Sequence, residues 1–272
     1  MKFHRSHSIN KPVRKNRQLL VSYLPDSLKN AIVSASKNRY EELYETESDQ
    51  DILLEDALNE ILASFESKNQ ALTQLRYVWM ALILAIAVKP TIKYYQPDSP
   101  IPEKTIAQLR KWLLETLAEI ISSSKGLNGT YKHSDALRSV NINHLFSEKN
   151  MPSLQVLSEA LDVYQNALKT LEPNHSLPAL LEILDDCLEG YAIFPGSEGR
   201  RELFDWWLSD VVPFCWYLLP PASIYRVNEL PHDRHDDQTS VSSQLEEISN
   251  LIWLLIDSDF FMYYDSSRFE PY

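Results

Sequence analysis

Glycine is scarce in this sequence, with only five glycines in 272 residues, where average usage would give about nineteen. This shortage argues against Gly-rich phosphate loops, tightly turned β-barrels and nucleotide-binding folds built on Gly-x-Gly-x-x-Gly. It favours helices that are joined by Pro, Ser and Asn. No catalytic motif is recognisable, so we expect no enzymatic activity, no cofactor and no bound metal.

Cysteine and long apolar runs are equally rare. The only cysteines, Cys187 and Cys215, lie in apolar helical stretches, with no Cys-x-x-Cys and no disulfide framework. The longest apolar run covers residues 77–88, whereas a membrane span needs about 20 residues. We therefore expect residues 77–88 to form a core helix. The basic N-terminus has no apolar segment of the kind that secretory signals contain, so we expect a cytoplasmic protein without membrane contact.

Helical spacing of apolar residues dominates, and alternating β patterns are absent after residue 24. The sequence predicts a mainly α protein, a multi-helix bundle with one possible short N-terminal strand at residues 18–24. The expected helices cover residues 25–44, 52–65, 71–95, 103–123, 135–147, 153–171, 177–191, 200–219 and 242–263. Residues 220–241, with three prolines and a polar run, form the longest expected loop of the body.

Charge divides the chain into a basic start and an acidic remainder. Residues 1–39 contain nine of the 26 Lys and Arg but one of the 38 Asp and Glu, for a net charge of +8. The remainder carries −20, which gives the total of −12. A basic arm of this kind can contact a polyanion such as DNA or RNA, which the acidic body would repel. The alternative is a solvated tail, or one that folds back on the acidic body.

Residues 17–62 resemble the ribbon-helix-helix family of DNA-binding regulators. In that family a strand that ends in Leu-Pro leads into a helix with apolar residues three, seven and ten positions after the proline. Here Leu24 and Pro25 are followed by Leu28, Ile32 and Ala35 at those positions. The second helix ends in Ala-Leu-x-x-x-Leu, which matches residues 57–62. The loop between the two helices, about residues 39–49, is longer than in the family and acidic.

The resemblance implies an intertwined homodimer that pairs two strands and lays the ribbon in the major groove of DNA. The family points the residues two, four and six positions before the proline toward the bases, which here are Tyr23, Val21 and Leu19. A register shift of one residue would point Gln18 outward instead. Phosphate contacts need positive charge rather than a sequence pattern. The residues expected to contact nucleic acid are Arg14, Lys15, Arg17, Gln18 and Tyr23.

Aromatic residues gather near residue 210, where Trp206, Trp207, Trp216 and Tyr217 occur within twelve positions. Adjacent tryptophans on an α-helix cannot both face one core, and Trp and Tyr are enriched in binding hot spots. These four residues are therefore a candidate surface for a protein partner. The alternative is an aromatic core around a helix that is kinked at Pro213.

Three polar clusters are candidates for chemical sites. His232 and His235 lie in an acidic, Pro-flanked loop and are interpreted as part of a solvated charge run rather than metal ligands. Asp186 and Glu189 are spaced to share one helix face, which is interpreted as solvated. Arg200 and Arg201 follow two glycines in a spacing that matches no phosphate-binding loop and indicates a turn.

These observations predict three parts: a basic arm (1–17), a ribbon-helix-helix-like module (18–68) and an acidic helical domain (69–272). The leading interpretation is a non-enzymatic regulator that binds DNA through its N-terminus and carries a helical effector domain. The alternative is a helical adaptor or assembly factor that binds a protein through its aromatic surface and has no nucleic-acid role.

Overall fold

One helix, α4 (Gln70–Tyr95), is mostly apolar, and its residues 72–88 are buried on every face. Our computed structural model describes residues 23–45, 52–124, 151–193, 199–226 and 236–255. Asn69 starts α4, because its side-chain oxygen accepts hydrogen bonds from the backbone N–H groups of Ala71 and Leu72. Residues 77–88 are at most 6% exposed, so the prediction that they form a core helix is confirmed.

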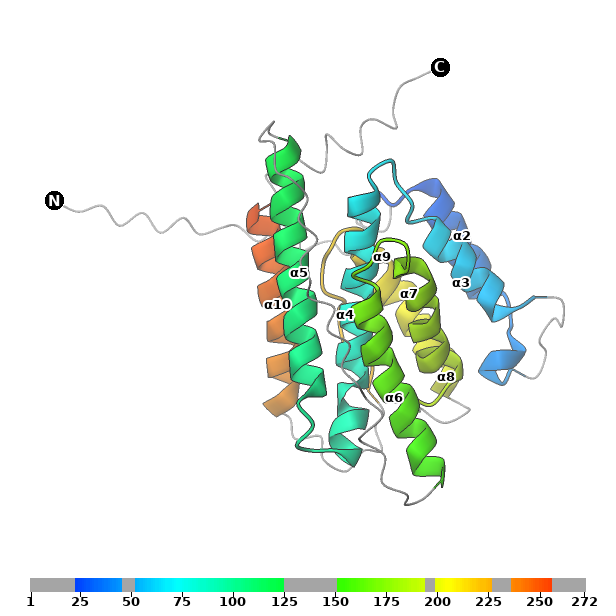
Figure 1. The fold of residues 1–272 in the computed structure, drawn as a ribbon. Helices are drawn as coiled ribbons and strands as arrows, with labels where there is room; N and C mark the ends of the chain where they lie inside the picture. Colours follow the sequence, from blue (N-terminus) through cyan, green and yellow to red (C-terminus); the bar gives the residue numbers. More distant parts are fainter. Residues whose placement is uncertain (1–22, 46–51, 125–150, 194–198, 227–235, 256–272) are drawn as a thin grey trace.

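The remaining helices surround α4 (Figure 1). In chain order they are α2 (Asp26–Lys37), η2 (Glu41–Leu43), α3 (Leu54–Ala63), α5 (Ile101–Ser124), α6 (Met151–Lys169), α7 (Ser176–Leu184), η4 (Asp185–Glu189), α8 (Arg200–Trp206), η6 (Trp207–Val211), α9 (Val212–Trp216) and α10 (Asp236–Leu255). Helices α5, α6, α7 and α9 contact α4 directly, and α10 packs on α5. Helices α2 and α3 pack on each other, and their apolar residues join the same continuous core as α4.

Two of these elements, η4 and η6, are π-helical turns. η4 extends α7 without a break, and η6 joins α8 to α9. A π turn takes one more residue per hydrogen-bonded ring than an α turn, and such turns often occur at functional sites. Pro213 follows η6 at the start of α9, where the missing N–H of a proline is tolerated.

Buried polar side chains of α4 hold the ends of neighbouring helices. Gln74 donates to the carbonyls of Thr170 and Leu171 just beyond α6. Trp79 donates to the carbonyl of Leu219, which follows α9. Helix C-termini leave carbonyls without intrahelical partners, so these contacts bond the carbonyls and fix where α6 and α9 end against α4.

The mainly α fold predicted from the sequence is confirmed, and the described residues contain no β-strand. Residues 18–22 of the expected strand and the expected helix at 135–147 lie outside the described residues. Two expected boundaries were wrong. α2 ends at Lys37, because Asn38 adopts an extended backbone. α10 starts at Asp236, inside the expected loop, because acidic residues stabilise a helix N-terminus even in a polar run.

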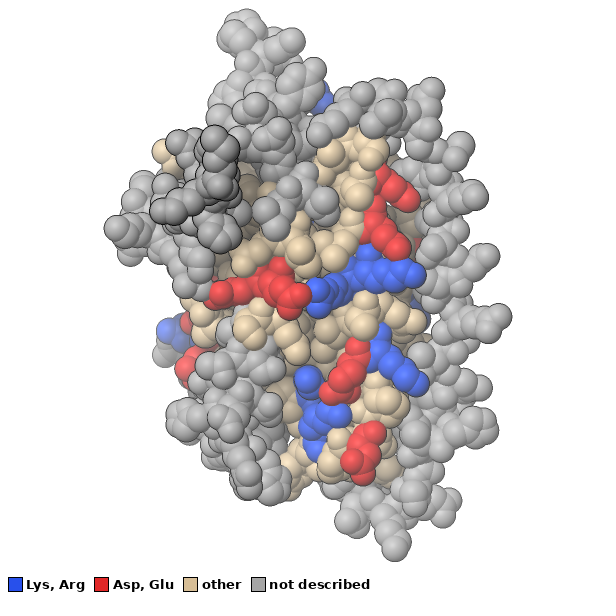
Figure 2. Space-filling view, turned by 90° about the vertical axis from the view of Figure 1, so that its left-hand side faces the viewer, with Lys and Arg blue, Asp and Glu red and all other residues tan. Residues whose placement is uncertain are grey.

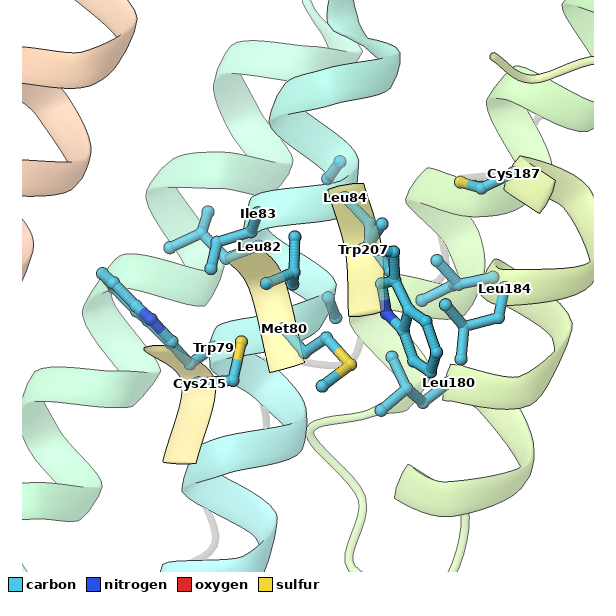
Figure 3. Packing of buried hydrophobic residues seen from close by; sticks show 14 of the residues in the cluster. Trp79, Met80, Leu82, Ile83, Leu84, Leu180, Leu184, Cys187, Trp207 and Cys215 are labelled. Carbon is cyan, nitrogen blue, oxygen red and sulfur yellow. The ribbon is translucent and has the colours of Figure 1, made fainter. Parts of the chain in front are cut away.

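By length and composition, α4 is apolar enough to cross a membrane. However, 94% of its most apolar window is buried inside the protein, as in the core helix of a soluble protein. In Figure 3 Trp79, Met80 and Leu82 of α4 lie among side chains from other helices, with Trp207 directed toward Leu180 and Leu184. The apolar surface of α4 is therefore covered by protein.

Candidate functional site

The N-terminal candidate site is only partly described. Arg14, Lys15, Arg17 and Gln18 lie outside the described residues. Tyr23 is 72% exposed, whereas the next residue, Leu24, is 2% exposed. Tyr23 therefore points outward and Leu24 inward, but the two residues form a turn and a bend ahead of α2 and not the end of a strand.

Positive charge on α2 is partly compensated by acids of the same segment. Lys29 pairs with Asp26 at 3.3 Å, and Arg39 pairs with Glu45 at 3.4 Å. Lys37 is exposed in the last turn of α2. Most of the net positive charge of the N-terminal sequence belongs to residues 1–17, which contain six Lys and Arg and no acid.

Arg201 anchors α2 to the body. Its Nη1 and Nη2 atoms donate to the carbonyls of Asn38 and Ser36 at 2.9 and 2.8 Å, at the C-terminal end of α2. Its Nε atom donates to Asp205 at 2.9 Å. The neighbouring Arg200 is completely buried and donates to the carbonyl of Leu188 at 2.6 Å. Both guanidinium groups therefore bond the protein's own backbone.

The aromatic cluster lies inside the protein. Trp206, Trp207 and Trp216 are 8%, 0% and 2% exposed, and Tyr217 is half-buried against the core. Trp206 donates to the carbonyl of Ser223 at 2.9 Å. The expectation that these residues form an exposed docking surface is therefore wrong for this conformation. The segment after α9 covers Trp206 through Ser223 and Tyr225, and Trp207 is directed toward Leu180 and Leu184 of α7 (Figure 3).

The ring of Trp216 is covered by the guanidinium group of Arg76. The guanidinium carbon of Arg76, from α4, lies 3.4 Å from the centre of the Trp216 ring, and Nε of Arg76 donates to the Trp216 carbonyl. Stacking of a guanidinium on an indole is a favourable cation–π contact, worth more when it is desolvated. Trp216 therefore packs against the buried Arg76 guanidinium and presents no exposed ring to a protein partner.

A polar groove of about 490 Å³ lies between α6 and the α7–η4 helix. It is lined by Asp162, Asn166, Lys169, His175, Pro178, Ala179, Glu182 and Asp186. Asp162, Glu182 and Asp186 form the acidic end of the groove. This end borders the turn after η4, where Glu159 accepts a hydrogen bond from the backbone N–H of Tyr191. A side chain at Gly190 would approach this same carboxylate and the Asp186 carbonyl to 2.7 Å. Because Gly190 has no side chain, the Glu159 carboxylate can approach the turn and accept this hydrogen bond.

The carboxyl groups at this end have unusual proton affinity. Burial, together with the neighbouring carboxylates of Asp162 and Glu159, raises the pKa of Asp186 to about 8. The pKa of Asp162 is also raised, mainly by desolvation, while Lys169 opposes the shift and Glu159 adds to it. Like charges that share a partly buried site disfavour ionisation, so Asp186 keeps its proton to a higher pH than an exposed acid does.

Glu189 faces a different neighbourhood. Burial and the carboxylates of Asp185 and Glu42 raise its pKa to about 7, while Arg200 opposes the shift. The expectation that Asp186 and Glu189 lie on one solvated face is therefore wrong. Asp186 interacts with acids of α6, whereas Glu189 interacts with Glu42 of η2, because the π turn separates the two side chains.

Sequence reasoning missed Glu159, Asp162 and Lys169 as site residues. Asp162, Asn166 and Lys169 recur at intervals of four and three residues, which places them along one face of α6. That spacing was a usable signal, but only the position of α7 distinguishes a groove from an ordinary polar face.

Within the described residues, no group of three or more His, Cys, Asp or Glu side chains is arranged to hold a metal ion. His232 and His235 lie outside the described residues. No family model matches the chain, and no curated protein or solved structure is significantly similar to it.

Proposed function

We propose that this chain is a non-enzymatic regulatory protein that binds DNA through its basic N-terminal segment and uses its acidic helical body as an effector domain. The charge distribution carries the proposal. Residues 1–17 hold six Lys and Arg without an acid, while the chain as a whole has a net charge of −12. Because phosphate contacts dominate the affinity of proteins for DNA, the arm would bind and the body would remain outside the duplex.

Two features of the described residues support this arrangement. Arg201 ties the end of α2 to α8, so the arm would extend from a fixed helix. On the face that contains α5 and α10, basic and acidic side chains lie beside one another (Figure 2), as in the Arg110–Glu247 pair at 2.7 Å. This described face offers no basic patch to compete with the arm.

The proposal includes self-association through the N-terminal strand and a cytoplasmic location. We propose that residues 18–22 of two copies pair as strands, since an apolar strand with a free edge needs a partner or a cover. We place the protein in the cytoplasm, where free thiols such as those of Cys187 and Cys215 stay reduced. The adaptor alternative would need a surface other than the aromatic cluster, because that cluster is buried.

The test measures how binding to a duplex of mixed sequence depends on salt, using fluorescence anisotropy. Each phosphate contact contributes about −0.9 to the slope of log affinity against log salt. Replacing Arg14, Lys15 and Arg17 by Ala should therefore flatten the slope by up to about 3. The matched control replaces Lys68, Lys104 and Lys111, which are exposed and lie outside the arm, by Ala; it removes the same charge and should leave the slope unchanged.

Two results would overturn the proposal. One is that the intact protein shows no binding even at low salt. The other is that the arm variant and the body variant lose affinity equally, because binding would then reflect overall charge and not the arm.

A further inference from the structure

Helices α2 and α3 form a helical hairpin that lies along one side of the bundle, against η6 and α7 (Figure 1). At one end of the hairpin the chain continues from α3 into α4. Thr73 and Tyr77 of α4 hold this end by donating hydrogen bonds to the carbonyls of Phe65 and Leu62. At the other end the turn η2 lies against the π turn η4. The hairpin therefore has a hinge end at α4 and a free end at η2.

The free end is closed by one arginine and by aromatic packing. Arg201 of α8 donates hydrogen bonds to the carbonyls of Ser36 and Asn38. The buried ring of Tyr40 packs edge-on against Phe204 of α8, with ring centroids 5.6 Å apart. These contacts attract the free end of the hairpin to the bundle.

Acidic side chains from both sides of the same contact act on Glu189 of η4. They are Asp185 from η4 itself, Glu42 from η2 and Glu55 from α3, while Arg200 of α8 opposes them. Two of the three acids therefore belong to the hairpin. Like charges in a partly buried site disfavour ionisation, so Glu189 binds its proton more tightly when the hairpin is closed.

The hairpin side of this contact is also incompletely bonded. Oε1 of Glu42 accepts a hydrogen bond from the backbone N–H of Leu54 at 3.3 Å, but Oε2 is buried without a hydrogen-bond partner among the described residues. Tyr44, at the end of η2, has a left-handed backbone with φ 60°, which non-glycine residues rarely adopt. Both features favour an open form, in which water can bond Oε2 and the turn can relax.

We propose that the hairpin opens from the bundle at its η2 end as a unit, and that this contact is a pH-sensitive latch. Arg201 and the aromatic packing close the latch. Repulsion of ionised Glu189 by Glu42 and Glu55 favours opening. The closed form predominates at every pH because the apolar residues of α2 and α3 are buried in it, and the pH sets how often the hairpin opens. This device goes beyond the proposed DNA binding and does not depend on it.

The direction of the pH dependence follows from which form binds the proton more tightly. The pKa of Glu189 is raised from its ordinary value of 4.5 to about 7, and opening moves it back toward 4.5 by removing Glu42 and Glu55 and admitting water. Opening therefore releases a proton between these values, so the opening equilibrium constant rises with pH up to about 7 and then levels off. Asp185 stays beside Glu189 in both forms, so we expect a rise of about threefold to tenfold between pH 5 and 7.

Hydrogen–deuterium exchange of the full chain at pH 5, 6, 7 and 8, without nucleic acid, tests the proposal. Protection factors correct for the intrinsic pH dependence of amide exchange. The protection of α2 and α3 should fall about threefold to tenfold between pH 5 and 7 and then level off, while α4 stays more protected at each pH. Glu189→Gln should remove this fall. Glu55→Gln should reduce it, and Glu55 is exposed, so this second variant should fold.

Glu60→Gln and Asp186→Asn are matched controls that should leave the fall unchanged. Glu60 is an exposed acid of α3 that is not among the groups acting on Glu189, and Asp186 lies on η4 but interacts with acids of α6. The proposal is wrong if α2 and α3 are equally protected at pH 5 and pH 7, or if Glu189→Gln and Glu55→Gln both keep the full fall. It is also wrong if α2, α3 and α4 always exchange together, since the hairpin would then not open by itself.

Discussion

Replacing Asp186 by Asn should stabilise the protein at pH 8 and have little effect at pH 4. Burial and the surrounding acids raise the pKa of this carboxyl from its ordinary value of 3.8 to about 8. Between these two values the folded protein keeps a proton that the unfolded chain has lost, so the free energy of unfolding falls as pH rises. Asn has the shape of the protonated acid and carries no charge at any pH.

The magnitude follows from the shift and the position of the side chain. One pKa unit corresponds to about 1.4 kcal/mol, so the full shift of about four units sets an upper limit of about 6 kcal/mol. Asp186 lines an open groove and is only partly buried, and water in the groove screens its repulsion from neighbouring acids. We therefore expect Asp186→Asn to gain about 1–3 kcal/mol at pH 8.

Urea unfolding followed by tryptophan fluorescence at pH 4, 6 and 8 measures this gain. Asp98→Asn is the matched control, because Asp98 is exposed and its replacement should change stability equally little at every pH. A gain that is the same at pH 4 and pH 8, or a loss at pH 8, would refute the reasoning, since it would show that Asp186 is ionised in the folded protein at ordinary pH.

Two further substitutions test the packing. Trp79→Ala should lower the free energy of unfolding in urea by about 3–5 kcal/mol, because it leaves a cavity in the core and an unbonded carbonyl at Leu219. A loss below about 1 kcal/mol would contradict the described core. Arg201→Met should cost about 2 kcal/mol and speed amide hydrogen exchange in α2, whereas Arg110→Met, at an exposed pair, should do neither.

Sequence periodicity predicted the helices because burial in this protein follows it closely. Residues 77–88 were assigned to the core from their length alone, and the structure buries them on all sides. Predicted helix ends were wrong where a single polar residue decides between helical and extended backbone. Asn38 ends α2 seven residues earlier than expected, although its side chain differs little in polarity from those around it.

The adjacent tryptophans show a different limit of sequence reasoning. On a regular α-helix, Trp206 and Trp207 point about 100° apart, so one was expected at an interface. Trp207 is fully buried in the core, and the chain after α9 returns to cover Trp206 through Ser223 and Tyr225. The returning chain has no pattern that could be recognised in advance.

The groove could not be predicted because its residues are individually ordinary. Asp162 and Lys169 resemble the polar face of any surface helix, and Glu182 and Asp186 resemble another. Their significance arises when α6 and α7 are placed antiparallel, so that acids meet acids at one end. The sequence spacing pairs Asp186 with Glu189 on its own helix, whereas the carboxylates that act on Asp186 most strongly come from α6.

The proposed homodimer must differ from the dimer that the family resemblance implies. Apolar residues of α2 and α3 such as Leu28 and Leu58 are already buried within one chain, so a second copy would gain mainly the strand pairing and exposed side chains such as Tyr23 and Val33. A two-stranded ribbon alone is marginally stable, and DNA that binds only the paired form would stabilise it by mass action.

We therefore expect sedimentation to show a monomer without DNA and two copies per duplex with DNA. Val21→Pro, which removes a backbone donor from the ribbon, should abolish the second copy while the arm still binds phosphates. A single copy per duplex for the unsubstituted protein would instead show that the arm acts alone.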